Sequence, residues 1–183
     1  MDTLIRIQST PNPNALKFIV NKPVKAEGNA TYKSAEECHA NPLARHVFTV
    51  PHVSEVYFFD NCVTVSQDGS VDWSEIEDQI KNAILAKIDA HDPNFAVTTT
   101  ASKPQTAQTP EIAKINEILD RTVRPALQGD GGDLQVLGLD GNTLLVNYQG
   151  ACGSCPSSTA GTLKAIEGIL KEEFNPEIVV QAA

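Results

Sequence analysis

Two cysteines spaced three positions apart are the residues of this chain whose types and spacing most directly suggest chemistry. Cys152 and Cys155 lie within the segment 150–158, which reads GACGSCPSS. Thiolates are soft ligands that bind zinc, Cu(I) and iron–sulfur clusters, and a Cys-x-x-Cys pair can also exchange disulfides as a redox dithiol. The pair therefore has three interpretations: half of a metal or cluster site, a redox dithiol, or two structural thiols.

The metal interpretation requires more ligands than the second half of the chain provides. Structural zinc and iron–sulfur clusters normally take four protein ligands, whereas residues 111–183 contain Cys152 and Cys155 but no histidine and no other cysteine. The remaining candidates all lie in the first half: Cys38, Cys62, His39, His46, His52 and His91. The simplest source of the missing ligands is a second copy of the chain, related by a two-fold axis, so that two pairs form one four-cysteine site.

The position of the pair suits both the metal and the redox interpretation. We predict a strand over 143–148 before it and a helix over 157–173 after it, with Pro156 at the first helical position. A helix N-terminus stabilises thiolates and anionic clusters by about 0.3–1 kcal/mol. Gly150 and Gly153 let backbone N–H groups approach sulfur closely, and such hydrogen bonds tune a cluster.

Two features weigh against the redox interpretation without excluding it. No histidine or lysine lies close in sequence to lower a cysteine pKa further. In a thioredoxin-like chain the pair follows the first strand of a βαβ unit, whereas here it follows a predicted hairpin late in the chain. A thiol–disulfide oxidoreductase that uses the Cys152/Cys155 dithiol is therefore kept as the alternative, and a zinc-bridged dimer as the third interpretation.

The charge distribution argues against several classes of partner. The formal net charge of −9 divides into −5 for residues 1–96, +1 for 97–110 and −5 for 111–183. Neither half is basic, so nucleic acid is not expected as a partner. No stretch approaches 18 consecutive apolar residues, so no membrane span is expected. The first residues lack the pattern of a secretion signal or transit peptide, and a cytoplasmic location is expected.

The apolar patterns predict an α+β fold of two small α/β domains joined by a flexible linker. Residues 97–110 contain prolines and no periodic apolar pattern, which is typical of a linker. Residues 1–96 are predicted as a domain with the order β-β-α-β-β-α. Residues 111–183 are predicted as a second domain with the order α-β-β-α-β.

Caps, turns and apolar spacing locate the predicted elements. In the first domain we expect strands over 3–9, 15–20, 53–59 and 62–66, short helices near Ser34 and from Asn41, and a helix from Asp72 to about His91. In the second we expect a helix from Pro110 that ends or kinks at Pro125, a glycine-rich turn over 127–133, a hairpin of 134–139 and 143–148, the helix over 157–173 and a strand over 177–181.

Two separate stretches on each side of the linker resemble one known family. In the second half they are RPALQGDGGD over 124–133 and the CxxC segment over 150–158. In the first half they are TPNPNALKF over 10–18 and DWSE over 72–75. Together they resemble the Nfu-type (NifU-like) iron–sulfur cluster carriers, and the likeness covers nearly the whole chain outside the linker.

The resemblance implies a non-enzymatic carrier that holds a [4Fe-4S] cluster, one per homodimer, and hands it to apo iron–sulfur client proteins. Cys152 and Cys155 would be the ligands, each from both subunits, and the N-terminal domain would help to recognise clients. Because the chain lacks the scaffold and ferredoxin-like domains of full NifU proteins, an upstream cluster scaffold would supply the cluster.

Other residues of chemical interest have simpler interpretations. The Cys38-His39 pair is expected to be incidental, and Cys62 is expected to be partly buried in a strand. Asp130 and Asp133 do not have the spacing of an EF-hand loop, so we expect them to form a turn or cap. No Ser-His-Asp order, P-loop or dinucleotide-binding fingerprint is present.

Overall fold

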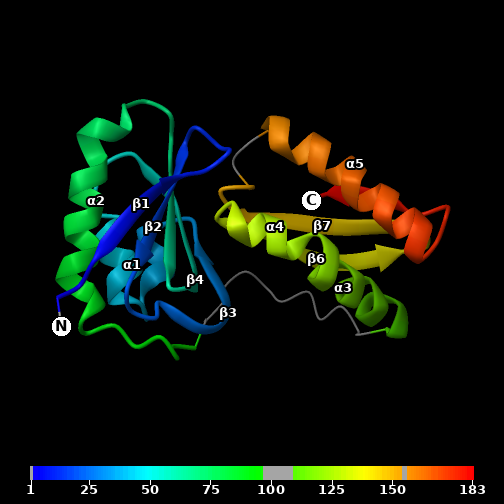
Figure 1. Ribbon diagram of the computed structural model, residues 1–183, viewed down its shortest axis with the longest axis horizontal. Coiled ribbons are helices and arrows are strands. Elements are labelled where there is room, and N and C mark those ends of the chain that lie inside the picture. Colours follow the sequence, from blue (N-terminus) through cyan, green and yellow to red (C-terminus); the bar gives the residue numbers. More distant parts are fainter. Residues whose placement is uncertain (1, 97–108, 154–155) are drawn as a thin grey trace. The chain divides into compact units, whose positions relative to one another are not determined.

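The computed structural model describes residues 2–96, 109–153 and 156–183, which form two compact units. Unit 1 lies within Met1–Thr100 and unit 2 within Ala101–Ala183 (Figure 1). Each unit combines helices with its own sheet, so the predicted α+β class is confirmed. The predicted linker falls almost entirely outside the described residues, and its bounds stay a prediction.

Unit 1 is built on a five-stranded sheet with the order β1-β2-β5-β4-β3. Its strands are β1 (Ile5–Ser9), β2 (Ala15–Val20), β3 (Lys25–Tyr32), β4 (Val53–Asp60) and β5 (Cys62–Gln67). Every neighbouring pair is antiparallel. The predicted hairpin of the last two strands is confirmed, with Phe59 opposite Cys62 and Phe58 opposite Val63.

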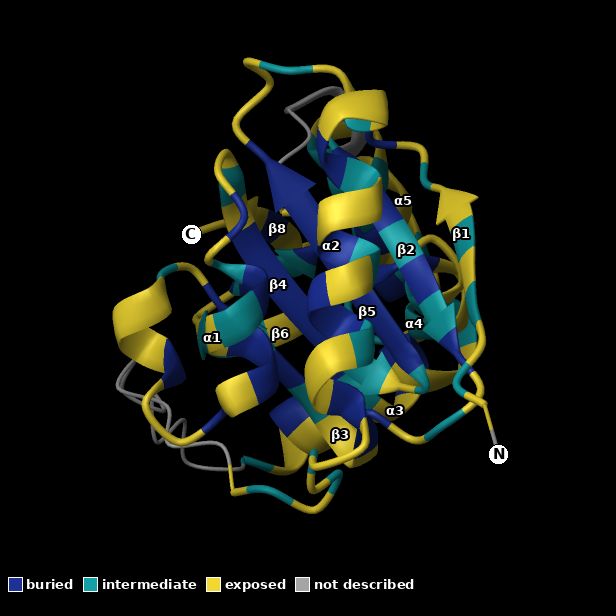
Figure 2. Ribbon diagram, turned by 90° about the vertical axis from the view of Figure 1, so that its left-hand side faces the viewer, coloured by how far each residue is buried: buried dark blue, intermediate teal, exposed yellow. Residues whose placement is uncertain are grey.

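Helices cover one face of this sheet and complete the core of unit 1 (Figure 2). They are the 3-10 helix η1 (Ala35–Cys38), α1 (Pro42–Val47) and α2 (Trp73–Ile88). The side chain of Asn41 accepts a hydrogen bond from the Ala44 N–H at 3.0 Å, so the predicted cap of α1 is confirmed. The isoleucines that recur every four residues along α2 are all buried: Ile76, Ile80, Ile84 and Ile88.

The predicted order of unit 1 is wrong by one strand, because β3 was not predicted. Its sequence, KAEGNATY, is mostly polar and contains glycine and asparagine, which are rare in strands. The strand forms at the sheet edge by pairing with β4, across an irregularity between Lys25 and Asn29. Gly28 within it has a φ of +68°, a conformation that suits glycine. Pairing with a neighbour, rather than local propensity, therefore decides this element.

Unit 2 contains helices beside a three-stranded sheet (Figure 1). Its elements are α3 (Pro110–Thr122), α4 (Arg124–Gly129), β6 (Gly132–Asp140), β7 (Thr143–Gly150), α5 (Pro156–Glu173) and β8 (Val179–Ala182). The sheet order is β6-β7-β8, with β6 and β7 antiparallel and β8 parallel to β7. The apolar faces of α3 and α5 pack into one core with the sheet.

The start of unit 2 confirms one predicted boundary and corrects another. The Thr109 hydroxyl accepts a hydrogen bond from the Ile112 N–H at 3.3 Å, and Pro110 is the first residue of α3. The first helix ends at Thr122, near Pro125 as predicted, but a second helix, α4, begins at Arg124 and contains Pro125 in its first turn. The predicted turn over 127–133 is therefore wrong at both ends, because the chain is helical as far as Gly129 and β6 already begins at Gly132.

His91 gives unit 1 a pH-dependent contact. Its Nε2 donates to the carbonyl oxygen of Val24 at 2.7 Å, and its ring stands edge-on to Phe58 and Phe95. Burial lowers the pKa of His91 below the usual value, and the hydrogen bond to Val24 opposes this only in part. The folded chain therefore keeps His91 neutral at a pH where the unfolded chain binds a proton.

We predict that unit 1 loses stability as the pH falls below about 6.5, because protons then favour the unfolded state. Urea unfolding can be followed by the fluorescence of Trp73, the single tryptophan, between about pH 7.5 and about pH 5.5. His91→Gln keeps a side-chain donor but cannot titrate, and it should lose less stability over this range than the wild type. His39→Gln removes an exposed histidine and should behave as the wild type does. Equal losses in wild type and His91→Gln would contradict the prediction.

Candidate metal centre

Cys152 lies in the turn between the end of β7 and the start of α5. Its side chain is partly buried and packs against the core of unit 2. The turn is closed by a hydrogen bond from the Gly153 N–H to the Gly150 carbonyl at 3.0 Å. Pro156 is the first residue of α5, as predicted. Cys155 lies outside the described residues, so the structure places only Cys152 of the predicted pair.

Gly132 lies directly against Cys152. Gly132 pairs with Gly150 across the β6–β7 hairpin. A Cβ atom added at Gly132 would lie 2.6 Å from the Cys152 Sγ and 2.8 Å from the carbonyl oxygen of Gln149. Both distances are shorter than van der Waals contact, and the second involves backbone. Only glycine therefore lets β6 pass this close beneath the thiol.

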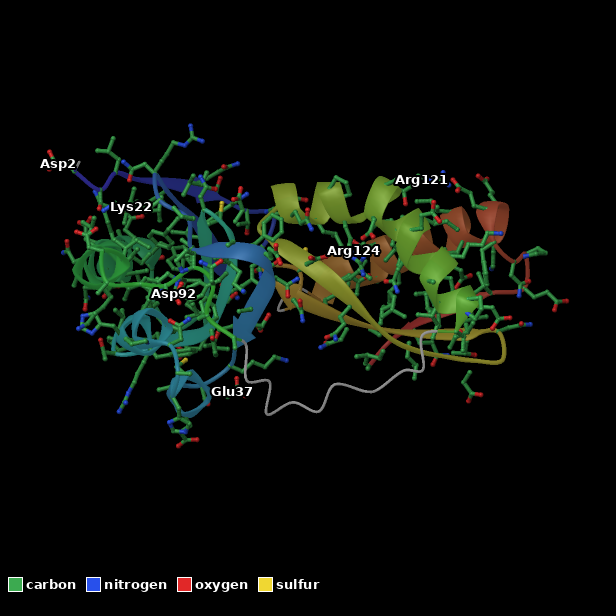
Figure 3. The ribbon with its side chains drawn as sticks, turned by 90° about the horizontal axis from the view of Figure 1, so that it is seen from below. Asp2, Lys22, Glu37, Asp92, Arg121 and Arg124 are labelled. Carbon is green, nitrogen blue, oxygen red and sulfur yellow. The ribbon has the colours of Figure 1, made fainter. Side chains whose placement is uncertain are left out.

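A buried ion pair in unit 2 stabilises the start of β6, where Gly132 lies. The Asp133 side chain is buried, and its Oδ1 lies 3.6 Å from the Arg124 Nε and accepts from the Leu134 N–H at 2.7 Å. Arg124 (Figure 3) also donates to the side chain of Asn116 at 2.9 Å and pairs with Asp120. These bonds connect α3 and α4 to the first residues of β6. The stretch 124–133 is therefore the support of the CxxC turn.

This support corrects the prediction for Asp133. We expected Asp133 to form a turn or cap, but its carboxylate is buried and pairs with Arg124. Asp130, in contrast, is the residue that ends α4, in agreement with the prediction. Arg124 and Asp133 are the first and last residues of the stretch 124–133 that resembles the family, and this position draws attention to both. Their spacing in the sequence does not, however, predict that their side chains pair.

Tyr148 is a functional candidate that the sequence did not reveal. It lies on the core-facing side of β7 and is 6% exposed. Its hydroxyl has no hydrogen-bond partner among the residues that the structure describes. Burial, followed by the charge of the nearby Cys152, raises the pKa of Tyr148 to about 12. The site thus holds a protonated phenol next to a thiol.

The other two described thiols, Cys38 and Cys62, belong to unit 1. Cys38 is fully buried and donates to the carbonyl oxygen of Ser34 at 3.3 Å, and Cys62 is buried in β5. Burial, followed by the charge of Glu37, raises the pKa of Cys38 to about 12. Burial also raises the pKa of Cys62. Both thiols therefore stay protonated. Across 2–96, 109–153 and 156–183, no three metal-binding side chains gather into a site.

Comparison with known proteins identifies the family. Residues 5–91 match the family model "Scaffold protein Nfu/NifU N terminal", and residues 115–181 match the "NifU-like domain". A human protein named "NFU1 iron-sulfur cluster scaffold homolog, mitochondrial" is 32% identical over 176 residues, which cover 95% of this chain and 69% of that protein. The chain therefore belongs to the Nfu-type (NifU-like) family, and the resemblance seen in the sequence is confirmed.

Other relatives are similar over the same length of chain. "NifU-like protein 4, mitochondrial" from Arabidopsis thaliana is 34% identical over 172 residues, covering 91% of this chain and 61% of the relative. This chain thus spans about six tenths of the length of that relative. A solution structure of a NifU-like protein from Saccharomyces cerevisiae is similar, with 24% sequence identity and a TM-score of 0.43. The matched region covers 53% of this chain and 85% of the chain in that structure.

We predict that Gly132→Ala destabilises unit 2 by about 1–3 kcal/mol, because the added methyl group must displace Cys152 and the backbone at Gln149. Hydrogen exchange of the β6 and β7 amides measures unit 2 separately from unit 1. Gly161→Ala is the matched control, since nothing lies within 4 Å of its added Cβ. It lies inside α5 and should stabilise by up to about 1 kcal/mol. Equal protection in Gly132→Ala and wild type would contradict the prediction.

We also predict that Asp133→Asn destabilises unit 2 by about 3 kcal/mol, because it removes one partner of a buried ion pair and leaves the Arg124 charge poorly compensated. Asp120→Asn removes the exposed partner of the same arginine and should cost much less. The same exchange measurement compares the two variants. Similar losses in both would show that Asp133 is not the dominant partner of Arg124.

Proposed function

We propose that this chain is an iron–sulfur cluster carrier that binds a [4Fe-4S] cluster through Cys152 and Cys155 and transfers it to apo-proteins. The observation that carries the proposal is a soft ligand, Cys152, held partly exposed on a supported turn at the start of a helix. Membership of the Nfu-type family supports the same function. The cluster is the cargo of this protein, and no catalysis is proposed.

The ligand count supports a cluster shared by two subunits. Residues 111–183 supply two thiols and no histidine, whereas a cubane cluster takes four ligands. Cys38 and Cys62 are buried with raised pKa values, so they make poor replacements. Two copies of the chain would each provide Cys152 and Cys155, giving one cluster per homodimer.

The geometry around Cys152 suits a cluster that must be both held and released. Gly132 brings backbone close to sulfur, and the start of α5 presents positive potential to an anionic cluster. The Cys152 thiol is only partly buried, so an incoming client thiolate can reach the iron atom that Cys152 binds. Each exchange forms one iron–sulfur bond to the client and breaks one to the carrier. Two ligands per subunit allow this exchange to proceed one bond at a time.

The proposal also gives unit 1 a role and includes two kinds of partner protein. Unit 1, proposed for residues 1–96, would recognise apo iron–sulfur clients, and an upstream scaffold would supply the cluster. Its thiols take no part in ligation. No helix among the described residues is long and apolar enough to cross a membrane. The names of the similar relatives place those proteins in mitochondria, and a cytoplasmic location for this chain stays a prediction.

Anaerobic reconstitution with iron and sulfide tests the proposal. We expect about four irons and about four sulfides per dimer, measured by chemical analysis, visible absorbance and native mass together. Cys152→Ser and Cys155→Ser should each abolish binding. Cys38→Ala, which removes a buried thiol from unit 1, should leave the iron content unchanged. Transfer is then measured as activation of an apo-[4Fe-4S] enzyme by the loaded carrier.

The other interpretations give different results in the same experiment. A monomer that takes up no cluster but reduces disulfides would identify a thiol–disulfide oxidoreductase. Tight zinc binding without visible absorption would identify a zinc-bridged dimer. A loaded dimer that never activates an apo-enzyme would contradict cluster transfer and would indicate that the chain only stores the cluster.

A further inference from the structure

The hydroxyl of Tyr148 is a buried polar group of unit 2 that has no hydrogen-bond partner among the described residues. The residue is 6% exposed, and the hydroxyl makes no hydrogen bond within the described part of the chain. A buried hydroxyl without a partner lowers stability, because it gives up its hydrogen bonds to water and gains none in return. Phenylalanine would fill the same space without this cost. The hydroxyl therefore calls for a partner beyond the residues that the structure describes, such as a bound ligand.

The surroundings of Tyr148 indicate where that partner binds. Tyr148 and Cys152 contact the same apolar core, and Leu134 faces Tyr148 across the hairpin. After Tyr148 the chain turns back, so that a Cβ atom added at Gly153 would lie 3.0 Å from the Tyr148 carbonyl oxygen. The Cys152 charge is one cause of the raised pKa of the phenol. Gly132 and Leu134 are two residues apart on β6 and therefore face the same side of the hairpin, so the Cys152 sulfur against Gly132 lies over the same face as the Tyr148 side chain.

We propose that Tyr148 is a positioning residue for the cluster, whose hydroxyl donates a hydrogen bond to the Cys152 sulfur once that sulfur binds iron. The inference rests on the proposed function. An iron-bound thiolate is a hydrogen-bond acceptor, whereas a phenol that remains protonated is a donor, so the two groups are complementary. In the loaded carrier the hydroxyl gains a partner that it does not have among the described residues of the apo chain.

The hydrogen bond has two consequences that packing alone would not produce. It withdraws electron density from the ligating sulfur, which raises the reduction potential of the cluster. The hydrogen bond also changes how the hydroxyl affects stability. The hydroxyl lowers the stability of the apo chain, where it has no partner among the described residues, but it is hydrogen-bonded in the loaded chain. Removing the hydroxyl should therefore stabilise the apo chain and shift the loaded cluster to a more negative potential.

Tyr148→Phe in the full chain tests this inference, with Tyr32→Phe as the matched control. Tyr32 is equally buried but lies in unit 1, where its hydroxyl accepts from the Asn41 side chain. All three proteins are reconstituted with iron and sulfide, and the cluster potential is measured by redox titration. Resonance Raman spectra in H₂O and D₂O report exchangeable hydrogen bonds to the ligating sulfurs. Hydrogen exchange of β6 and β7 measures the apo stability of unit 2.

We expect every protein to load a cluster. Only Tyr148→Phe should show a more negative potential, a smaller deuterium shift of the iron–sulfur stretching bands and slower exchange in the apo state. Equal potentials and equal deuterium shifts in wild type and Tyr148→Phe would overturn the inference and leave the proposed function intact. Faster apo exchange in Tyr148→Phe would also overturn it, because the hydroxyl would then have a partner without the cluster. A wild type that loads no cluster would instead refute the proposed function, and this inference with it.

Discussion

The close approach of β6 to Cys152 is the constraint on which the rest of unit 2 depends. A side chain at Gly132 would occupy the space of the thiol and of the backbone at Gln149. The hairpin can therefore bring its two ends together only because Gly132 has no side chain. The buried pair of Arg124 and Asp133 then fixes the helical segment that leads into this glycine. The backbone at Gly132 therefore limits the space that is available to the Cys152 thiol.

The two units divide the chemistry of the chain between them. Unit 1 has its own core, built from a sheet and the buried face of α2, and its two thiols are buried with raised pKa values. Unit 2 has a smaller core and a thiol at its surface. Protonated, buried thiols compete poorly for iron because the thiolate is the ligand. In the proposed function, cluster binding is thereby left to the CxxC segment.

The proposed carrier function calls for a site that is not already optimal without its cargo. The hydroxyl of Tyr148 lowers the stability of the folded chain alone, since it is buried without a partner among the described residues. Natural sequences tolerate such local costs at functional sites, where the binding of a ligand compensates for them. The same reasoning applies to the exposure of Cys152, which reduces how tightly a cluster is enclosed but leaves a path for an incoming thiolate.

The sequence by itself determined the features that depend on local rules. The cap at Asn41, the helix start at Thr109 and Pro110, the isoleucine stripe of α2 and the two hairpins all follow from residue type and short spacing. The ligand role of the Cys152/Cys155 pair follows from the same kind of local pattern and stays a proposal. Tertiary structure alone decided β3, a polar edge strand formed by pairing with β4. It also decided the buried pair of Asp133 with Arg124, the close approach of Gly132 to Cys152 and the burial of the Tyr148 hydroxyl. Each of these depends on contacts between different elements of the fold, so burial and contact, rather than local propensity, set its energy.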